Sequence, residues 1–272
     1  MTLRPPTEAE LDGERLYGED LTAAEVAEWF QDEREAYARL GSADRETYRY
    51  PDHGVNARHG FRFLPRARFE QALGLGSAHG DEFLPLQDRL GEVTIVEPSS
   101  ALRVCRLRVP FRYLDPTPSG RIPLEEGSID LALCLGVLHH IPSVSTAISE
   151  LGRILRPGGY ALIREPTVSM GDWTRSRPGL TPHERGIPLL LLVGLIRAAG
   201  LEIVRVTRYA FPASSQIARA LRADTYNTPW LVRLDEIASR AFAWNRRYHA
   251  RRWYEKLRPT AAFVVARRPR AP

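Results

Sequence analysis

Two adjacent histidines, His139 and His140, are the residues of this chain best suited to acid–base chemistry. They follow a short run, Ile129 to Leu135, with the length and almost continuous apolar content of a buried parallel strand. Imidazole titrates near neutral pH, so either ring could take a proton from a substrate hydroxyl. Alternatively, one ring caps the helix expected to start near Ser143. Glu165, after the next predicted strand, is the next candidate for a catalytic base.

The histidines belong to a longer stretch, Ser128 to Pro166, whose pattern predicts strand, loop, helix, turn and strand. The helix is expected to begin at Pro142 and Ser143 and to stop at Pro157-Gly158-Gly159. Its apolar face repeats at helical spacing through Val144, Ala147, Ile148, Leu151, Ile154 and Leu155. Turns this short predict a right-handed βαβ unit of a parallel sheet. Ligands of such sheets bind beyond the carboxyl ends of the strands, here Leu135 to His140 and Arg164 to Pro166.

A glycine-rich segment links the first predicted strand, Phe69 to Leu75, to a predicted helix from Asp81 to Leu90. Its candidate ligand contacts are Gly74, Gly76, Ser77 and Gly80. Glycines let the backbone turn tightly and approach a ligand, and a helix N-terminus offers N–H groups to an anion. Taken alone, this loop could serve NAD, FAD or S-adenosylmethionine.

Two acids follow predicted strands on the same side of the sheet. Glu97 ends the strand Glu92 to Glu97 and lies 21 residues beyond Gly76, where nucleotide-binding α/β folds place the carboxylate that binds the ribose hydroxyls. The alternative is an acid at a solvated strand end. Asp115 ends the third predicted strand and is a candidate for the adenine amino group.

The stretch around the histidines resembles the later half of class I S-adenosylmethionine-dependent methyltransferases. The resemblance rests on Glu125 to Asp130, Leu138 to Pro142 and Arg156 to Gly159. It implies an α/β, Rossmann-like sheet of seven mostly parallel strands with an antiparallel last strand and helices on both faces. It also implies S-adenosylmethionine as cofactor, held by Gly74, Gly76, Ser77, Gly80, Glu97, Asp115 and Leu135.

The glycine loop departs from the family pattern at two positions. The pattern has an acid where this chain has Gly74, and a glycine where it has Ala78. Either Asp81 or Glu82 compensates, which we favour, or the cofactor site is weakened. The second interpretation would fit a cofactor-binding or partner-binding module that has lost catalysis.

The segments around the sheet are expected to shape the acceptor site. Residues 1–64 form a predicted N-terminal helical or lid segment with a helix from Leu21 to Leu40, and residues 65–272 the methyltransferase domain. That domain would include a lid loop, 167–188, and a helical insertion, 211–258. Candidate substrate contacts are Tyr50, His53, Arg164, Trp173, Glu184 and Arg185. The alternatives are a packed extension and a structural clamp of the lid.

Composition narrows the function classes further. The chain has 272 residues, 43% of them hydrophobic, and a formal charge of +5 with Lys256 as its single lysine. A Gly-Lys-Ser/Thr phosphate loop is therefore impossible. No apolar run reaches the roughly 18 residues of a membrane span, and no Cys and His cluster predicts a metal. Cys134 lies in a predicted core strand, so we expect no disulfide and a cytoplasmic location.

The sequence therefore predicts a methyltransferase acting on an oxygen of a sugar, glycan or similar polar small molecule in a biosynthetic pathway. The segment Gly179 to Pro188 resembles bacterial methyltransferases of cell-surface glycan and natural-product clusters. An N- or C-methyltransferase of a natural product is the alternative. A nucleic-acid substrate is disfavoured because no Asn/Asp-Pro-Pro-Tyr signature follows the fourth strand. The arginines and aromatics from Trp244 to Trp253 could contact phosphates, form a solvated helix face or make a homodimer contact.

Overall fold

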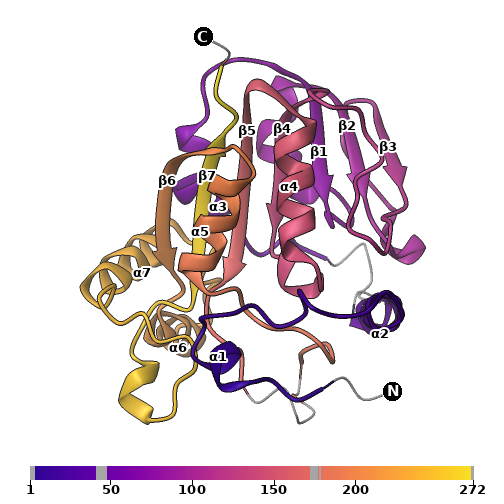
Figure 1. Cartoon of the computed structure of the whole chain (residues 1–272). Coiled ribbons are helices and arrows are strands. Elements are labelled where there is room, and N and C mark those ends of the chain that lie inside the picture. Colours follow the sequence, from indigo (N-terminus) through magenta and orange to yellow (C-terminus); the bar gives the residue numbers. More distant parts are fainter. Residues whose placement is uncertain (1–3, 41–47, 172–176, 178, 271–272) are drawn as a thin grey trace.

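The protein is described by a computed structural model that covers residues 4–40, 48–171, 177 and 179–270. One sheet of seven strands has the order β3-β2-β1-β4-β5-β7-β6 (Figure 1). The strands are β1 (Phe69–Leu75), β2 (Leu90–Val96), β3 (Phe111–Leu114), β4 (Ile129–Leu135), β5 (Leu155–Pro166), β6 (Glu202–Tyr209) and β7 (Ala261–Arg267). Strand β7 is antiparallel to both of its neighbours, β5 and β6, and all other strand pairs are parallel. The predicted sheet is confirmed.

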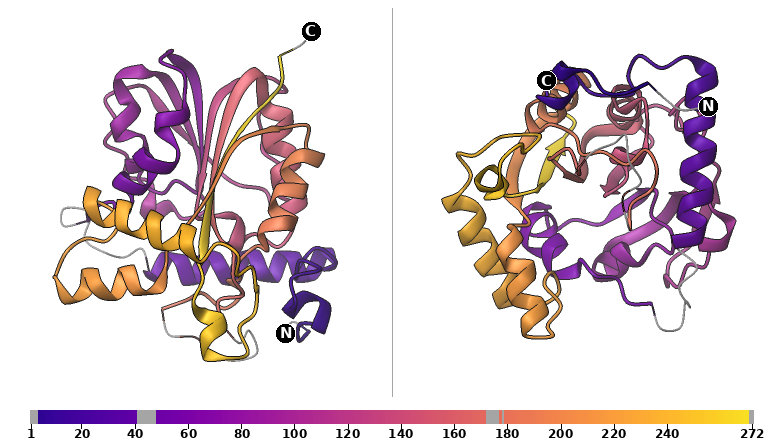
Figure 2. Two further views of the ribbon diagram at one scale, coloured as in Figure 1. Left: turned by 90° about the vertical axis from the view of Figure 1, so that its left-hand side faces the viewer. Right: turned by 90° about the horizontal axis from the view of Figure 1, so that it is seen from below.

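Helices cover both faces of this sheet (Figure 2). The α-helices are α1 (Glu8–Leu11), α2 (Ala23–Leu40), α3 (His53–His59), α4 (Val144–Ile154), α5 (Leu189–Ala198), α6 (Pro212–Ala220) and α7 (Pro229–Ala241). The 3-10 helices are η1 (Phe61–Phe63), η2 (Asp81–Arg89), η3 (Ser100–Leu102), η4 (Leu138–His140) and η5 (Trp253–Lys256). The central strands are buried on both sides and alternate between two cores. One core contains the apolar faces of α4 and α5, and the other contains Val55 of α3, Phe61 and Phe83.

The predicted βαβ unit is confirmed as β4, α4 and β5, whose two strands pair in parallel. The connection between α4 and β5 differs from the prediction in where the helix ends. The helix ends at Ile154 and β5 starts at Leu155, so Pro157-Gly158-Gly159 lies inside the strand. Gly158 has a left-handed φ of +85°. The helix therefore stops before the turn residues expected to end it.

A helix is present from Asp81 to Arg89, close to the expected Asp81 to Leu90, and it has 3-10 geometry. Pro85 lies inside it. Proline has no N–H, so it interrupts the backbone hydrogen bonding of the helix at this residue.

The N-terminal segment and the insertion lie at the carboxyl end of the parallel strands. Seen from below, α2 and the α6–α7 pair flank that end on opposite sides (Figure 2). The amide of Asn227, between α6 and α7, donates to the carbonyl of Tyr50 at 2.9 Å. The backbone N–H of Val55 donates to the carbonyl of Tyr226 at 3.0 Å. Among the helices of the described residues, none has the length and apolar content needed to cross a bilayer.

Candidate active site

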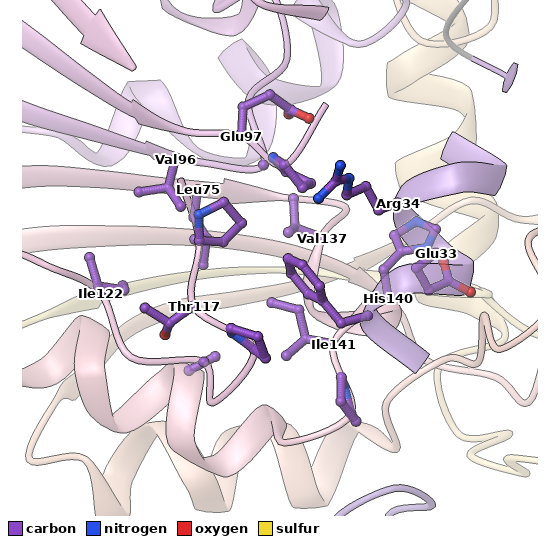
Figure 3. A pocket seen from close by; sticks show the side chains of 18 of the residues that line it. Glu33, Arg34, Leu75, Val96, Glu97, Thr117, Ile122, Val137, His140 and Ile141 are labelled. Atoms are coloured by element: carbon purple, nitrogen blue, oxygen red, sulfur yellow. Dashed lines mark hydrogen bonds and ion pairs between the residues drawn. The ribbon is translucent and has the colours of Figure 1, made fainter. Parts of the chain in front are cut away.

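Two pockets meet where β1 and β4 end, and Gly76 and Gly136 line both. The first, which we call the apolar pocket, includes Leu75, Val96, Ile122, Val137 and Ile141 in its lining (Figure 3). The second, the polar pocket, includes Tyr48, Tyr50, Asp52, Ser77, Asp81, Glu82 and Arg164. Together the pockets form one elongated site across the carboxyl ends of the central strands. This is the position at which open α/β sheets bind ligands.

Glycines make the junction between the pockets possible. Gly76 has φ +61° and Gly136 φ +82°, a region that favours glycine. A Cβ on Gly76 would lie 2.6 Å from the Val137 side chain. A Cβ on Gly74 would collide with the side chains of Ser77 and Phe83. This packing leaves no room for a larger side chain at position 74, one of the two positions where the chain departs from the family pattern.

Gly80 supports the loop from outside the pockets. Its φ is +73°, and a Cβ there would face Ile95 at 3.0 Å. Gly80 is absent from both linings, as is Gly74, whereas Ser77 and Leu135 line the polar pocket. Of the predicted glycine contacts, only Gly76 therefore borders a pocket directly.

Glu97 lies at the end of β2 and lines the apolar pocket (Figure 3). Its carboxylate accepts N–H bonds from Ala78 at 3.0 Å and from Ser99 at 2.9 Å. Burial raises the pKa of Glu97, and the two N–H donors partly oppose this rise. Asp115 is exposed, pairs with Arg103 and is absent from the pocket lining, although the next residues, Pro116 and Thr117, belong to it.

The polar pocket has an excess of acids. Asp52, Asp81 and Glu82 face it together with one cation, Arg164. Arg164 pairs with Asp52 at 2.7 Å. Burial raises the pKa of Glu82 to about 7. This lining suits a ligand group that carries a positive charge.

His139 is held between two carboxylates. Its Nδ1 lies 2.7 Å from Glu165 Oε2, and its Nε2 lies 3.3 Å from Glu184 Oε1. Burial alone would lower the pKa of His139, but these acids outweigh it and raise the pKa to about 9. Burial opposes the ionisation of Glu184 as well, yet the histidines hold its pKa at about 2. His139 is therefore an imidazolium at neutral pH and has no site for another proton.

The pKa of His140 is shifted in the opposite direction to that of His139. It lines the apolar pocket, and its Nδ1 lies 2.7 Å from Glu33 Oε2 of α2 (Figure 3). Burial lowers the pKa of His140, and the positive His139 lowers it further. Burial would raise the pKa of Glu33, but the bond with His140 helps to lower it. The proton between His140 and Glu33 therefore belongs on Nδ1 of a neutral His140. In such a carboxylate–histidine pair the other ring nitrogen, Nε2, can accept a proton.

Glu165 anchors the loop after β4 rather than facing a pocket. It accepts N–H bonds from Val137 at 2.9 Å, Leu138 at 2.8 Å and His139 at 3.3 Å. Its side chain is fully buried. These contacts shape the turn that presents His140 and occupy both carboxylate oxygens.

Like Glu165, Arg185 binds backbone groups of the loop after β4. It is fully buried and donates to the carbonyls of Tyr17 at 3.0 Å, His139 at 2.9 Å and Ile141 at 2.9 Å. Arg185 and Glu184 are absent from both pocket linings, and so is His53, which packs against Tyr50. Trp173 lies outside the described residues.

Glu33 and its neighbour Trp29 are functional candidates that the sequence reasoning missed. Trp29 is fully buried, and its Nε1 donates to the carbonyl of His140 at 2.7 Å. Its ring stacks on His183 at 4.8 Å. Trp29 and Glu33 are four residues apart and share a helix face. A carboxylate next to a tryptophan on the buried face of α2 was the available signal.

His139, His140 and Glu184 each offer a ligand atom, and these atoms lie within 4.8 Å of one another. Among the described residues this trio is the cluster able to hold a metal ion. The two carboxylates around His139 favour the imidazolium instead, because a metal ligand must be deprotonated.

Residues 73–163 match a family model described as a methyltransferase domain. The matched segment is about a third of the chain and is similar to methyltransferase domains. It runs from β1 into β5 and includes the glycine turn, Glu97 and both histidines. This similarity implies S-adenosylmethionine as the cofactor.

Two curated proteins share short segments with this chain. A probable S-adenosylmethionine-dependent methyltransferase of Mycolicibacterium smegmatis is 30% identical over 82 residues, which are 30% of this chain and 32% of that protein. An uncharacterised protein of a Streptomyces fradiae transposon is 44% identical over 52 residues, 19% of this chain and 14% of that protein. The chain thus matches about a third or less of the length of these relatives.

Several solved structures share the fold of this chain. The [4+2]-cyclase SpnF superposes with a TM-score of 0.55 at 18% identity, covering 88% of this chain and 97% of that chain. An S-adenosylmethionine-dependent methyltransferase from Mesorhizobium loti gives a TM-score of 0.51 at 16% identity, covering 76% and 94%. At sequence identities this low, the similarity shows a shared fold and not a shared function.

Proposed function

We propose that this chain is an S-adenosylmethionine-dependent methyltransferase whose cofactor occupies both pockets. The nucleoside would lie in the apolar pocket with its ribose on Glu97, and the amino acid part would lie in the polar pocket. The acidic lining there fits the ammonium group, and Asp81 and Glu82 take the place of the family acid that Gly74 excludes. When bound, the cofactor supplies an electrophilic methyl group, while the protein provides orientation.

We further propose that the acceptor is a hydroxyl group of a sugar, glycan or similar polar small molecule. The observation that favours oxygen is the pairing of His140 with Glu33 at 2.7 Å beside the apolar pocket. A neutral imidazole can take the hydroxyl proton, and the Glu33 carboxylate stabilises the imidazolium that forms. His139 and Glu165 act as positioning residues, since their hydrogen bonds hold the turn that contains His140.

The N-terminal segment, 1–64, would act as a lid in this proposal. Phe30, Glu33 and Arg34 line the apolar pocket, and Tyr48, Tyr50, Pro51 and Asp52 line the polar one. Tyr50 and Arg164 are the substrate or cofactor contacts that this geometry favours. The loop 167–188 would contribute indirectly, through Glu184 and Thr181 beside the histidines.

A second candidate is a reaction other than methyl transfer. The structural neighbour SpnF is titled a cyclase, and one fold can host unrelated chemistry. An N- or C-methyltransferase of a natural product uses the same cofactor site without needing the His140–Glu33 pair as a base.

A product screen by mass spectrometry separates these candidates. The full chain is incubated with S-adenosylmethionine and with sugars, nucleotide sugars, phenols and amines, and calorimetry measures cofactor binding in parallel. A methylated hydroxyl supports the proposal, and a methylated amine or carbon supports the alternative acceptor. Cofactor binding without any methylated product would favour the other reaction class, and no cofactor binding would refute the assignment.

A further inference from the structure

We propose that the insertion, residues 211–258, is a docking surface for an anionic membrane. The charge of the chain is concentrated in this insertion. It contains ten Arg and Lys residues and four Asp and Glu residues, a net charge of +6. The whole chain has a net charge of +5, so the remaining residues together have −1. This inference is independent of the proposed function.

The exposed apolar side chains are concentrated in the same segment. Thirteen large hydrophobic residues are exposed in the part of the chain that the structure describes, and nine of them belong to the insertion. The nine are Ile217, Leu221, Trp230, Leu234, Ile237, Trp244, Trp253, Tyr254 and Leu257. Scattered exposed apolar residues are normal, whereas a concentration of them marks an interaction site.

Helix α7 turns its apolar stripe outward. Trp230, Leu234 and Ile237 are exposed at helical spacing, with Arg233 and Arg240 exposed beside them. The inward face combines the buried apolar side chains of Leu231 and Val232 with two acids. Asp235 accepts the backbone N–H groups of Ala210 and Phe211, and Glu236 pairs with Arg58 and Arg240. The helix is therefore apolar on its outward side as well, which covering a soluble domain does not require. An apolar stripe flanked by arginines is typical of a helix that lies in a membrane interface.

Two further exposed tryptophans follow α7 within the insertion. Trp244 is 76% exposed and Trp253 is 77% exposed. Arg246 and Arg247 are exposed between them, and Arg247 is near enough to Glu255 to help lower the pKa of that acid. Tryptophan prefers the depth of the lipid headgroups, where its ring meets acyl chains and its N–H meets water. Arginine next to it would bind lipid phosphates.

Charge complementarity decides between occupants. A second copy of the chain would bring two surfaces of charge +6 together. A nucleic acid would neutralise the arginines but would leave the aliphatic residues Leu234 and Ile237 without an apolar partner. An anionic bilayer satisfies both groups at once. The surface also lies toward the carboxyl end of the parallel strands, the end that contains the pockets (Figure 1).

Vesicle co-sedimentation of the full chain tests the proposal. Two kinds of vesicle are compared, phosphatidylcholine alone and an equal mixture of phosphatidylcholine and phosphatidylglycerol. We expect binding to the mixed vesicles, weakened by added salt because the attraction to the surface is partly electrostatic. The double substitutions Trp244→Ala/Trp253→Ala and Arg246→Glu/Arg247→Glu should each weaken binding at least about tenfold.

The matched control is Arg106→Glu/Arg108→Glu. It reverses two exposed charges in a segment outside the insertion. This control should bind vesicles nearly as well as the parent chain. Retained cofactor affinity in each variant shows that it is folded. Equal binding to both kinds of vesicle, or no binding to either, would overturn the proposal. Binding of an oligonucleotide or formation of a dimer, with no vesicle binding, would overturn it in favour of those partners.

Discussion

His140 Nδ1 lies 2.7 Å from Glu33 Oε2, although 107 residues separate them in the chain. The contact joins the N-terminal helix α2 to the loop after β4, beside the apolar pocket. Burial and the positive charge of His139 lower the pKa of His140, and Glu33 partly opposes this lowering. The proposed base is therefore completed by a residue from outside the matched methyltransferase domain.

The first prediction concerns this pair. Glu33→Gln should lower kcat by about tenfold to a hundredfold, and His140→Ala should lower it by at least as much, because a general base contributes about 10² to 10⁴ in rate. Cofactor affinity should change much less than kcat in both variants. Steady-state kinetics and calorimetry measure the two effects. Glu35→Gln, an exposed acid of the same helix, is the control and should match the parent chain. Unchanged turnover in Glu33→Gln would remove the pair from the mechanism.

The second prediction is a pH profile. A base must be unprotonated to act, so kcat/KM should rise with pH through the pKa of His140. Burial and His139 lower this pKa from 6.5, so the midpoint should lie below 6.5. Glu33→Gln should move the midpoint lower still, since Glu33 raises the pKa of His140. A profile without an acid limb would contradict the assignment.

The third prediction concerns stability near His139. Folding raises its pKa from 6.5 to about 9, so its stabilising contribution is complete below pH 6.5 and is lost as pH rises through 9. The free energy of unfolding should therefore fall over this interval by about 1 to 3 kcal/mol. Urea titrations at several pH values measure the slope. His139→Gln should reduce the slope, and an identical slope in that variant would show that another group causes it.

The fourth prediction separates two acids assigned to the nucleoside. Glu97→Ala should weaken S-adenosylmethionine binding at least about a hundredfold, because each hydrogen bond to a charged group contributes about 1.5 to 3 kcal/mol. Asp115→Ala should have little effect, since Asp115 is exposed and points to Arg103. Calorimetry measures both. The reverse ranking would place the ribose on Asp115.

The fifth prediction uses two glycines with opposite surroundings. Gly74→Ala should destabilise the protein by about 1 to 3 kcal/mol, because its Cβ would overlap Ser77 and Phe83. Gly194→Ala, in α5, should be neutral or stabilising by up to about 1 kcal/mol, because nothing lies within 4 Å of its Cβ. Thermal unfolding compares the two. Equal stabilities would mean that the loop relaxes around the new methyl group.

The sequence was most informative where the signal is local. The strand, helix and strand around the histidines follow from short-range patterns, and the structure has them. The antiparallel last strand was expected from the family resemblance, and it is present as β7. The helix at Asp81 was expected, but its 3-10 geometry was not, because a segment this short has no clear helical period. Glu33 was missed because its partner is 107 residues away and periodicity contains no information about such pairs. The different protonation of His139 and His140 depends on Glu165 and Glu184, whose proximity only the fold reveals.

Trp29 has a consequence for how ligands exchange. Its indole donates to the carbonyl of His140, stacks on His183 and lies beneath the guanidinium of Arg185 at 4.9 Å. The loop after β4 and the segment of His183 and Arg185 thus share one buried ring with α2, and neither can move outward without uncovering it. Exposing a buried tryptophan is costly, so we expect α2 and these two segments to separate only rarely and together. Admission of substrate would then depend on Tyr48, Tyr50, Pro51 and Asp52, which border the polar pocket.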